Sequence, residues 1–494
     1  MTTEQDLDAI YQAKLDGMPD ESIMKKFSVG LRDIEKAVIQ KKGVNLNLFA
    51  AKSKITSLAP KSFGLESTTV WSFKNRGKWA THSGDYRGNW SPYIPRNAIL
   101  RYSKPGELVL DQFCGGGTTA VEAKLLGRRC IARDINPAAI QLTDQNLNFS
   151  LMAQETLVET DDPTKFYEPN VSVGDARRLD GIENDSVDLI CTHPPYADIV
   201  QYTDGVQGDI SHHKVDEFIK DMRAVATECH RVLKLNGVCS ILIGDMRKNK
   251  RVVPLGFRTI EVFLEQGFLL KDLIIKRQHN CRTTGFWYSS SIKYNFLLLA
   301  QEYLPIFVKP DLDISYPRRK SRKVYHRTES VTIPPRPKEM QCKTTWVLPP
   351  NSFDELIDSN VLNRYGGNGH VLRIRPSEEK NDRIELGIAK YDLVYIGPII
   401  LWNKSDLVHY SHMMRDLVNE LAENISTEGI LVIRSRDFKE NGYTTIPALA
   451  LWRIPVDQFR IRELIVATTD EKQNLEESDE IQIIHEFLLV YEKI

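Results

Sequence analysis

The segment Thr192–Tyr202, THPPYADIVQY, combines residue types that can hold a flat, polar ring at the end of a strand. It continues the apolar run VDLIC, which predicts a buried strand. Two prolines cannot extend a ladder of backbone hydrogen bonds, but their fixed φ keeps the chain rigid. A polar side chain, His193, precedes the prolines, and an aromatic face, Tyr196, follows them. The pattern therefore indicates a ring-binding site at the mouth of a sheet.

A second stretch, LVLDQFCGGGTT at 108–119, reads as a strand, a glycine loop and the start of a helix. Glycines let a ligand approach the backbone, and a helix N-terminus favours a carboxylate. Asp134 ends the next strand, where a ribose diol would bind, and Asp175 ends a third, where it can accept from an adenine amino group. The loop has neither the dinucleotide glycine spacing nor a P-loop lysine. A nucleoside with a carboxylate tail and no phosphates indicates S-adenosylmethionine.

Together these stretches resemble the S-adenosylmethionine-dependent DNA amino-methyltransferases, which methylate the exocyclic nitrogen of cytosine or adenine. The family's loop, D-P-F-x-G-S-G-T-T, is matched at Asp111, Phe113, Gly115, Gly117, Thr118 and Thr119, with Gln112 and Gly116 departing from it. Its catalytic motif, [D/N/S]-P-P-[Y/F/W], is matched at Pro194, Pro195 and Tyr196, with His193 in the first position. The resemblance covers roughly residues 70–305. It implies an α/β, Rossmann-like class I methyltransferase fold with a mainly parallel seven-stranded sheet.

The chemistry that the resemblance implies is direct transfer from the sulfonium methyl to an exocyclic amine, without a covalent enzyme intermediate. Such an amine is a poor nucleophile, and acceptors on its N–H groups favour attack. The carbonyl of Pro194 is one acceptor and His193 is the other if its ring is neutral, while Tyr196 stacks on the base. Methylation at C5 of cytosine would need a cysteine nucleophile, typically in a Pro-Cys pair, which the sequence lacks.

Double-stranded DNA is the expected substrate, which requires the base to flip out of the helix. Thr192 before the motif resembles the family's T-S-P-P-Y variant, which is often linked to cytosine, so the resemblance implies cytosine N4 over adenine N6, and His193 weakens that preference. The aromatic candidates for substrate contact are Tyr202, Trp287 and Tyr288, the last two in the loop KRQHNCRTTGFWYSSS, which otherwise reads as a surface hairpin. Tyr86 and Trp90 are either core aromatics or cofactor contacts. Two alternatives stay open: an RNA base amino-methyltransferase, and a non-catalytic regulator that binds cofactor and DNA.

Four regions follow from the distribution of these patterns along the 494 residues. Residues 1–45 predict three short helices that resemble a helix-turn-helix unit or form a helical cap. Residues 46–305 alternate strands and helices and hold both motifs, with an antiparallel last strand. Residues 306–345 form a Pro-rich basic linker that includes the run 318–323, and residues 346–494 form the last region. The linker is either solvated or a phosphate-binding strap.

The last region contains an echo of the catalytic one. YDLVYIGPI at 391–399 parallels VDLICTHPP at 187–195, and the segments that follow each of them are also alike. The echo has lost the proline pair and has no glycine loop. We therefore expect the last region to be a degenerate half-copy of the catalytic region that recognises DNA or acts as a scaffold. The alternative is chance similarity between two α/β segments.

Bulk composition restricts the remaining possibilities. The net charge is −1, so any contact with nucleic acid must use local basic patches. The seven cysteines are scattered without a CxxC pair, which predicts a reduced cytoplasmic setting and no metal site. No apolar run is long enough for a membrane span, and the polar start is not a secretory signal. A restriction or defence partner is compatible with the sequence, which specifies neither the recognition site nor the oligomeric state.

Overall fold

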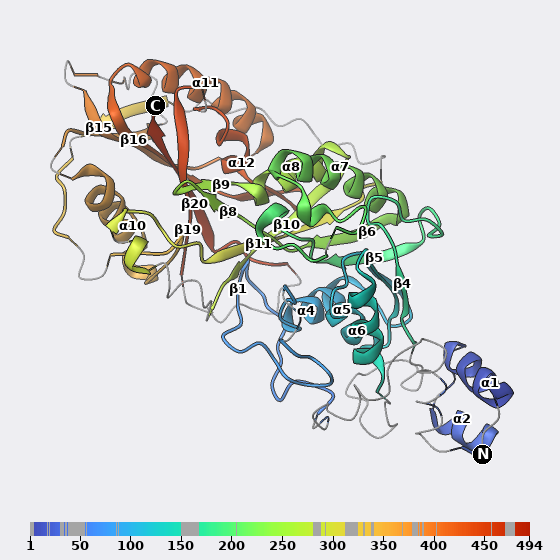
Figure 1. The fold of residues 1–494 in the computed structure, drawn as a ribbon. Coiled ribbons are helices and arrows are strands. Elements are labelled where there is room, and N and C mark those ends of the chain that lie inside the picture. The colour runs from blue at the N-terminus through green and yellow to red at the C-terminus, as the bar shows by residue number, and fades with distance from the viewer. Residues whose placement is uncertain are drawn as a thin grey trace.

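The computed structural model of the chain describes residues 4–29, 34, 37, 55, 57–149, 167–279, 288–311, 325–377, 384–469 and 480–494, apart from 17, 19, 85, 87, 204, 292, 330, 337–339, 368, 385, 388, 389, 402 and 456. Most of the third N-terminal helix, Trp287 and the basic run 318–323 lie outside the described residues. Two sheets form the body of the protein, and helices α1 and α2 lie at the opposite end from the C terminus (Figure 1). Among the described residues, no helix combines the length and apolar character needed to cross a bilayer.

The N-terminal helices α1 (Glu4–Leu15) and α2 (Asp20–Phe27) pack through a small apolar core of their own. Leu7 and Ile10 of α1 meet Ile23 of α2, and Ile34 and Ala37 complete the cluster. The helical spacing of these apolar residues is the pattern that predicted the helices. Whether this unit contacts DNA stays a prediction.

The first sheet follows the strand order β4-β3-β2-β5-β6-β11-β10-β1, with β7 paired to β11. Its strands are β1 (Val70–Ser72), β2 (Leu108–Asp111), β3 (Arg129–Asp134), β4 (Asn170–Val173), β5 (Val187–Thr192), β6 (Leu233–Ile241), β7 (Ile243–Gly244), β10 (Leu269–Arg277) and β11 (Gln301–Val308). Strand β11 is antiparallel to its neighbours, and the other pairs are parallel. The class I α/β architecture is therefore confirmed, with β1 and β7 added to the seven predicted strands.

The last strand of this sheet lies further along the chain than its apolar pattern predicts. The apolar run FLLLAQEY at residues 296–303 has the pattern of this strand, but β11 uses QEYLPIFV and continues past residue 305, the predicted domain boundary. Leu298 instead pairs with Lys343, and Ala300 donates its N–H to Thr344 Oγ1 at 3.1 Å. The apolar run is therefore used for packing against the second half of the chain.

Helices cover both faces of the first sheet. α4 (Tyr93–Tyr102), α5 (Thr118–Leu125) and α6 (Pro137–Leu147) share one apolar core with the sheet, and α7 (Val215–Val232) and α8 (Leu255–Glu265) share another. The side chains of β2 alternate between these cores, with Val109 in the first and Leu110 in the second. Burial on both faces explains the unbroken apolar runs of the parallel strands.

The second sheet follows the order β12-β14-β15-β16-β20-β19-β13. Its strands are β12 (Tyr325–Glu329), β13 (Thr345–Leu348), β14 (Val371–Ser377), β15 (Tyr391–Ile399), β16 (Ile425–Arg436), β19 (Phe459–Thr469) and β20 (His485–Lys493). Helices α10 (Phe353–Val361), α11 (Lys404–Ala422) and α12 (Pro447–Leu451) flank it (Figure 1). Two short ribbons, β8–β9 (Met246–Lys248, Arg251–Val253) and β17–β18 (Phe438–Glu440, Tyr443–Thr445), follow the equivalent strands β6–β7 and β16.

The two sheets repeat one another strand for strand over β5-β6-β11-β10-β1 and β15-β16-β20-β19-β13. Parallel and antiparallel pairs occur in the same order, with β13 parallel to β19 as β1 is to β10. Register shifts also recur, at Leu270/Asp272 in β10 and at Ile461/Glu463 in β19. Since bulges are local features of a given strand pair, their recurrence supports a true repeat over chance similarity. In this register Glu302 is equivalent to Glu486, and Gly244 to Arg436.

The repeats meet through reciprocal contacts, as the subunits of a two-fold dimer do. Thr69 accepts the N–H of Ile484 and contacts Nδ1 of His485 at 2.8 Å. The equivalent Thr344 accepts the N–H of Ala300 and contacts the side chain of Gln301, the counterpart of His485. In each repeat, the residue just before the edge strand thus contacts the antiparallel strand of the other repeat. Thr69, before β1, contacts β20, and Thr344, before β13, contacts β11. We call this contact region the exchange interface.

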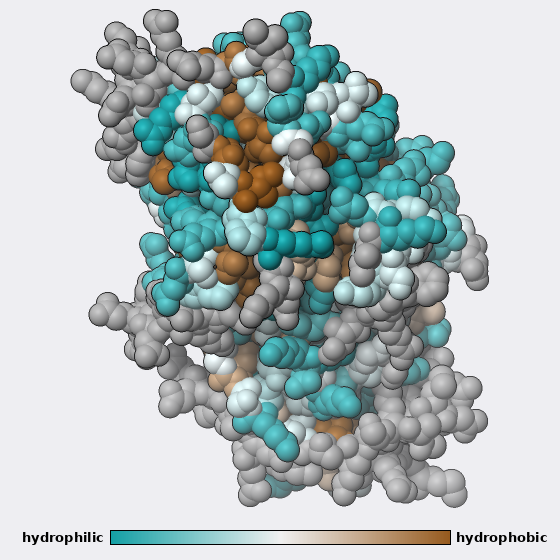
Figure 2. Space-filling model, turned by 90° about the vertical axis from the view of Figure 1, so that its left-hand side faces the viewer, coloured by the Kyte–Doolittle hydropathy of each residue, from teal (hydrophilic) through white to brown (hydrophobic). Residues whose placement is uncertain are grey.

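Figure 2 views the molecule from the side that faces left in Figure 1, where the second sheet lies. Hydrophilic side chains cover much of this face, and apolar ones gather in its upper part. Among the described residues of the second half, Ile400, Val408 and Ile494 are the large apolar side chains that are exposed.

Candidate active site

The glycine loop begins at the buried end of β2, where Asp111 ties three segments together. Its carboxylate accepts from the hydroxyls of Thr119 and Thr192, each at 2.6 Å, and from the N–H of Phe113 at 3.1 Å. These bonds link the strand to α5 and to the end of β5. Burial raises the pKa of Asp111 to about 6, although the hydroxyls oppose the shift.

The three glycines of the loop lie where neighbouring atoms leave little room for a side chain. Gly117 is the N-cap of α5 in the left-handed region, at φ 80°, and a Cβ there would lie 2.7 Å from Cγ2 of Thr143. Gly115 donates its N–H to Asp134 at 2.9 Å, and Gly116 donates to Oδ1 of Asn89 at 3.2 Å. Hydrogen bonds to Asp134 and to Asn89 therefore fix the conformation of the loop.

Two acidic residues follow the neighbouring strands and face the same edge of the sheet. Asp134 ends β3, and burial raises its pKa to about 6, against the N–H groups of Asn136 and Gly115. Asp175 follows β4 and forms an ion pair with Arg177 at 2.7 Å. The pKa of Asp175 lies below its usual value because the hydrogen bonds and charge of Arg177 outweigh burial.

These residues line a first pocket at the carboxyl ends of β2, β3 and β5, where the strand order reverses and open α/β sheets bind ligands. Its empty volume, which includes space open to solvent, is about 710 Å³. Of the predicted residues, those in its lining are Asp111, Phe113, Gly115, Asp134, Asp175, His193 and Pro195. Gly117, Thr118 and Thr119 do not line it; the two threonines are buried in the first turn of α5.

The motif residues lie at the end of β5, next to β2. The ring of His193 stacks on Trp90 at a centroid distance of 5.6 Å and an interplanar angle of 22°. Burial lowers the pKa of His193 to about 4, although the Glu302 carboxylate opposes the shift. The imidazole is therefore neutral at neutral pH, as its expected role as an acceptor requires.

A second pocket opens on the other side of His193. Pro194 and Tyr196 line it, together with a set of basic side chains: Lys74, Arg76, Lys276 and His279. The two pockets share five lining residues, Gly88, Asn89, Trp90, His193 and Tyr202. The glycine loop and the His-Pro-Pro-Tyr motif are thus brought together at one continuous site with two compartments.

A chain of polar contacts forms part of the second pocket. Tyr196 donates its hydroxyl to Oε1 of Glu302 at 2.9 Å, and Lys276 donates to Oε2 at 2.6 Å. Nε2 of His193 lies 2.9 Å from the Tyr196 hydroxyl. The Tyr196 ring fits against β7 because Gly244 has no side chain; a Cβ there would lie 2.7 Å from the ring.

Among the residues of this site that sequence reasoning missed are Asn89, Lys276 as a pocket residue, and Glu302. Asn89 stands beside Trp90, in a segment that resembles the flank of the family's loop, and that proximity was the available signal. Lys276 and Glu302 are cross-strand partners in β10 and β11. Only the strand register brings them to the motif, so no local pattern identifies them. Tyr86 and Trp90, left open above, both line the first pocket.

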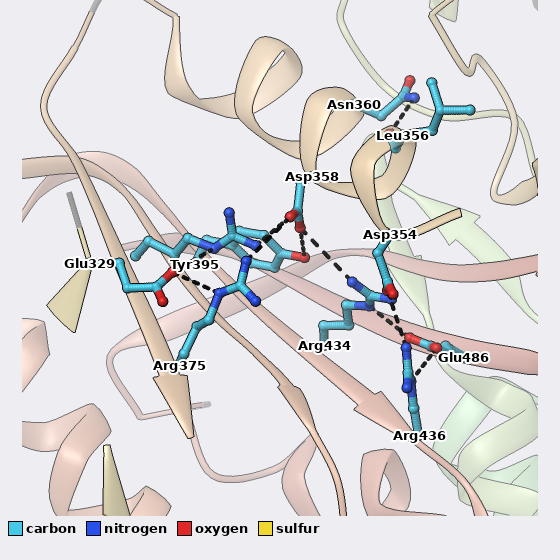
Figure 3. Close-up of polar contacts among 11 residues, drawn as sticks. Glu329, Asp354, Leu356, Asp358, Asn360, Arg375, Tyr395, Arg434, Arg436 and Glu486 are labelled. Atoms are coloured by element: carbon cyan, nitrogen blue, oxygen red, sulfur yellow. Dashed lines mark hydrogen bonds and ion pairs between the residues drawn. The ribbon is translucent and has the colours of Figure 1, made fainter. Parts of the chain in front are cut away.

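In the second half, the place equivalent to the motif is filled by an ion network (Figure 3). Gly397 and Pro398, joined by a cis peptide bond, replace His193 and Pro194. Arg434 of β16 is 1% exposed in its side chain and pairs with Asp354 and Glu486. Arg436 also pairs with both acids. The guanidinium groups occupy the carboxyl end of this sheet, where the first sheet has its pocket.

Comparison with known proteins places these features in context. A family model described as "DNA methylase" matches residues 32–145 and 187–390, more than half of the chain. A second model, described as "RMKL-like, methyltransferase domain", matches residues 97–228. Both matches include the glycine loop and the His-Pro-Pro-Tyr motif.

Curated relatives match shorter stretches. A tRNA (guanine(10)-N2)-dimethyltransferase of Methanothermobacter thermautotrophicus is 32% identical over 114 residues, 22% of this chain and 29% of the relative. The Type II methyltransferase M.MjaI of Methanocaldococcus jannaschii is 27% identical over 163 residues, 28% of this chain and 54% of the relative. M2.DpnII of Streptococcus pneumoniae is 34% identical over 87 residues, 17% of this chain and 31% of the relative. The chain thus spans between about a third and half of the length of these relatives.

Solved structures match less than half of the chain at low overall similarity. TrmN from Thermus thermophilus is 17% identical, with a TM-score of 0.28, over 45% of this chain and 50% of that one. A SAM-dependent methyltransferase from Methanosarcina mazei is 14% identical, with a TM-score of 0.30, over 43% of this chain and 96% of that one.

Proposed function

The chain belongs to the DNA methylase family, and from this premise we propose that it transfers a methyl group from S-adenosylmethionine to the exocyclic amino group of a base in DNA. The observation that carries the proposal is the meeting of two pockets at His193, one beside the glycine loop and acidic strand ends, the other beside the proline motif. A donor bound in the first and an amine in the second would meet beside that residue. Bound S-adenosylmethionine supplies an electrophilic sulfonium methyl.

The residues of the first pocket suit the chemical groups of this cofactor. Asp134 offers a carboxylate to ribose hydroxyls, and the N-terminus of α5 beside Gly115 favours a carboxylate tail. Gln112 lines the pocket, and its side-chain carbonyl is buried without a hydrogen-bond partner among the described residues, which suits an ammonium donor. Asp175, although paired with Arg177, keeps acceptor capacity for an amino group.

The residues of the second pocket suit a flipped base. The carbonyl of Pro194 and the neutral ring of His193 are acceptors for the two amine hydrogens, which draws the nitrogen lone pair toward the methyl donor. Tyr196 offers an aromatic surface, and Lys74 and Arg76 favour the phosphates that flank a flipped nucleotide. Positioning of the amine against the donor supplies roughly 7–11 kcal/mol when the geometry is optimal.

Cytosine N4 is the preferred target of the proposal and adenine N6 the other. Incubation with labelled S-adenosylmethionine and duplex DNA, followed by nucleoside digestion and mass spectrometry, identifies the modified base. We expect label in DNA that is lost in Pro194→Ala, while calorimetry shows unchanged cofactor binding. Absence of label from both duplex DNA and RNA, with cofactor bound, would turn the assignment to a regulator without catalysis.

RNA is the second candidate substrate, because one relative is named for guanine N2 of tRNA, which is also an exocyclic amine. Label that enters transfer RNA and not duplex DNA in the same assay would select it. For the second half of the chain we propose a recognition or scaffold role, since Gly397 and Pro398 replace His193 and Pro194 there and the paired Arg434 packs against Gly397. The restriction or defence partner stays a hypothesis, testable by co-purification from a natural host.

A further inference from the structure

His193 is the residue at which this chain departs from the family's catalytic motif, and its ring can accept a hydrogen bond at only one nitrogen. A neutral imidazole carries its single proton on either Nδ1 or Nε2. Which nitrogen is protonated therefore decides whether His193 can act on the target amine. The hydrogen-bond partners of the ring determine which nitrogen carries the proton.

The hydrogen bonds that link Lys276, Glu302, Tyr196 and His193 favour one tautomer of the His193 ring. Burial alone would raise the pKa of Glu302, but the charge of Lys276 outweighs it, so the pKa lies well below its usual value and the carboxylate is ionised. Its Oε1 then accepts a hydrogen bond from the Tyr196 hydroxyl, which has only one proton to donate. The hydroxyl oxygen, left with lone pairs, is an acceptor toward Nε2 of His193 at 2.9 Å.

We propose that Glu302, anchored by Lys276, holds the proton of the neutral His193 ring on Nε2 through the Tyr196 hydroxyl, which leaves Nδ1 as the acceptor for an N–H of the target amine. This inference rests on the proposed function. Lys276 and Glu302 are positioning residues, since they act through Tyr196. The backbone of Gly88 is the competing hydrogen-bond partner of the imidazole.

The second half of the chain provides an internal contrast. Glu486 is equivalent to Glu302 but is paired with Arg434 and Arg436. Arg436 stands where Gly244 makes room for the Tyr196 ring. The acid occurs in both repeats, whereas the aromatic hydroxyl and the imidazole that it controls belong to the catalytic repeat alone.

The tautomer can be read directly by ¹⁵N NMR of full-length protein labelled on histidine, with the His193 signals assigned from a His193→Gln spectrum. We expect the wild-type ring to carry its proton on Nε2. In Lys276→Met the buried Glu302 loses its counter-charge and takes up a proton, so Tyr196 donates to His193 and the ring proton moves to Nδ1. Lys276→Arg keeps the charge and restores the wild-type spectrum. A wild-type ring protonated on Nδ1, or an unchanged spectrum in Lys276→Met, would overturn the proposal.

Kinetics give an independent readout. We expect kcat for methyl transfer to fall roughly tenfold in Lys276→Met and Glu302→Gln, the loss of about one hydrogen bond to the amine, with KM for S-adenosylmethionine unchanged. Glu486→Gln is the matched control, because it removes the equivalent buried acid of the other repeat and leaves kcat intact. Equal losses of kcat in both Gln variants would indicate a structural role. A wild-type protein without activity on DNA would contradict the proposed function, while the NMR result would still decide the tautomer.

Discussion

Glu302 and Glu486 hold the same position in two copies of one sheet, and each is bound by basic groups in a different way. Glu302 shares its carboxylate between Lys276 and the hydroxyl of Tyr196 and lines a pocket. Glu486 accepts from Arg434 at one oxygen and from Arg436 at the other. In the first repeat Gly244 leaves room for the Tyr196 ring beside the acid, whereas Arg436 stands at the equivalent position in the second repeat.

The ion network of the second half is expected to be structural. Arg434→Met should lower the free energy of unfolding by up to about 3–5 kcal/mol, because it removes the buried guanidinium that pairs with the buried Glu486 and leaves only the partly exposed Arg436 beside that carboxylate. Urea unfolding followed by circular dichroism measures the change. Arg223→Met is the control, since Arg223 and Glu265 are about half exposed and their pair contributes little. A change below 1 kcal/mol in Arg434→Met would contradict this reading of the network.

The exchange interface should be equally sensitive on its two sides. Thr69→Val and Thr344→Val each remove a buried hydroxyl that accepts a backbone N–H, so each should cost about 1–3 kcal/mol of stability. Thermal unfolding of the two variants tests this. Thr227→Val, at an exposed helix position, should change stability by less than about 0.5 kcal/mol. A loss on one side only would show that the two contacts are not equivalent in energy.

Cofactor affinity should weaken as the pH falls through about 6. The pKa values of Asp134 and Asp111 are both raised to about 6 by burial, so both carboxylates become protonated below that pH. A protonated Asp134 no longer offers two acceptors to ribose hydroxyls. Calorimetric titration with S-adenosylmethionine between pH 5 and pH 8 should show a fall of up to about tenfold per pH unit for each carboxylate required. Asp134→Asn should bind more weakly and with a shallower pH dependence.

The neutral ring of His193 should make stability depend on pH between 6.5 and 4. Its pKa is about 4 in the folded protein and 6.5 without the fold, so the unfolded chain binds more protons in this window. The stabilisation is complete above pH 6.5 and is lost as the pH falls, by up to about 1.4 kcal/mol per unit. His193→Gln should flatten this part of the profile measured by urea unfolding. An identical slope in the variant would assign the pH dependence to other groups.

Basic side chains at the second pocket should contribute to DNA affinity and not to cofactor binding. Lys74→Ala should weaken binding of a short duplex about three- to tenfold and reduce the salt dependence by about one counterion. Fluorescence anisotropy at several salt concentrations measures both effects. Lys220→Ala, on the exposed surface of α7, should change neither. Equal effects of the two substitutions would mean that DNA does not approach this pocket.

The sequence predicts those parts of the site that depend on local patterns. The loop around Gly115 and the prolines after β5 carry their own signals, because backbone freedom and rigidity are properties of single residues. Glu302 and Lys276 carry none, since only the register of β10 against β11 brings them to Tyr196. The repeat is visible as matching segments, but the exchange interface is not, because it depends on how two complete sheets pack.

The exchange interface also has a consequence for how the protein reaches its native state. Thr69 and His485 are 416 positions apart, and the sheet that holds the catalytic motif is completed at its edge by this contact. A ribosome that adds about 5–20 residues per second needs on the order of 20–80 seconds to supply the later partner. For the part of that interval after β11 has been made, about 9–35 seconds for the 177 residues from Val308 to His485, the edge of the first sheet at β1 stays exposed in the nascent chain.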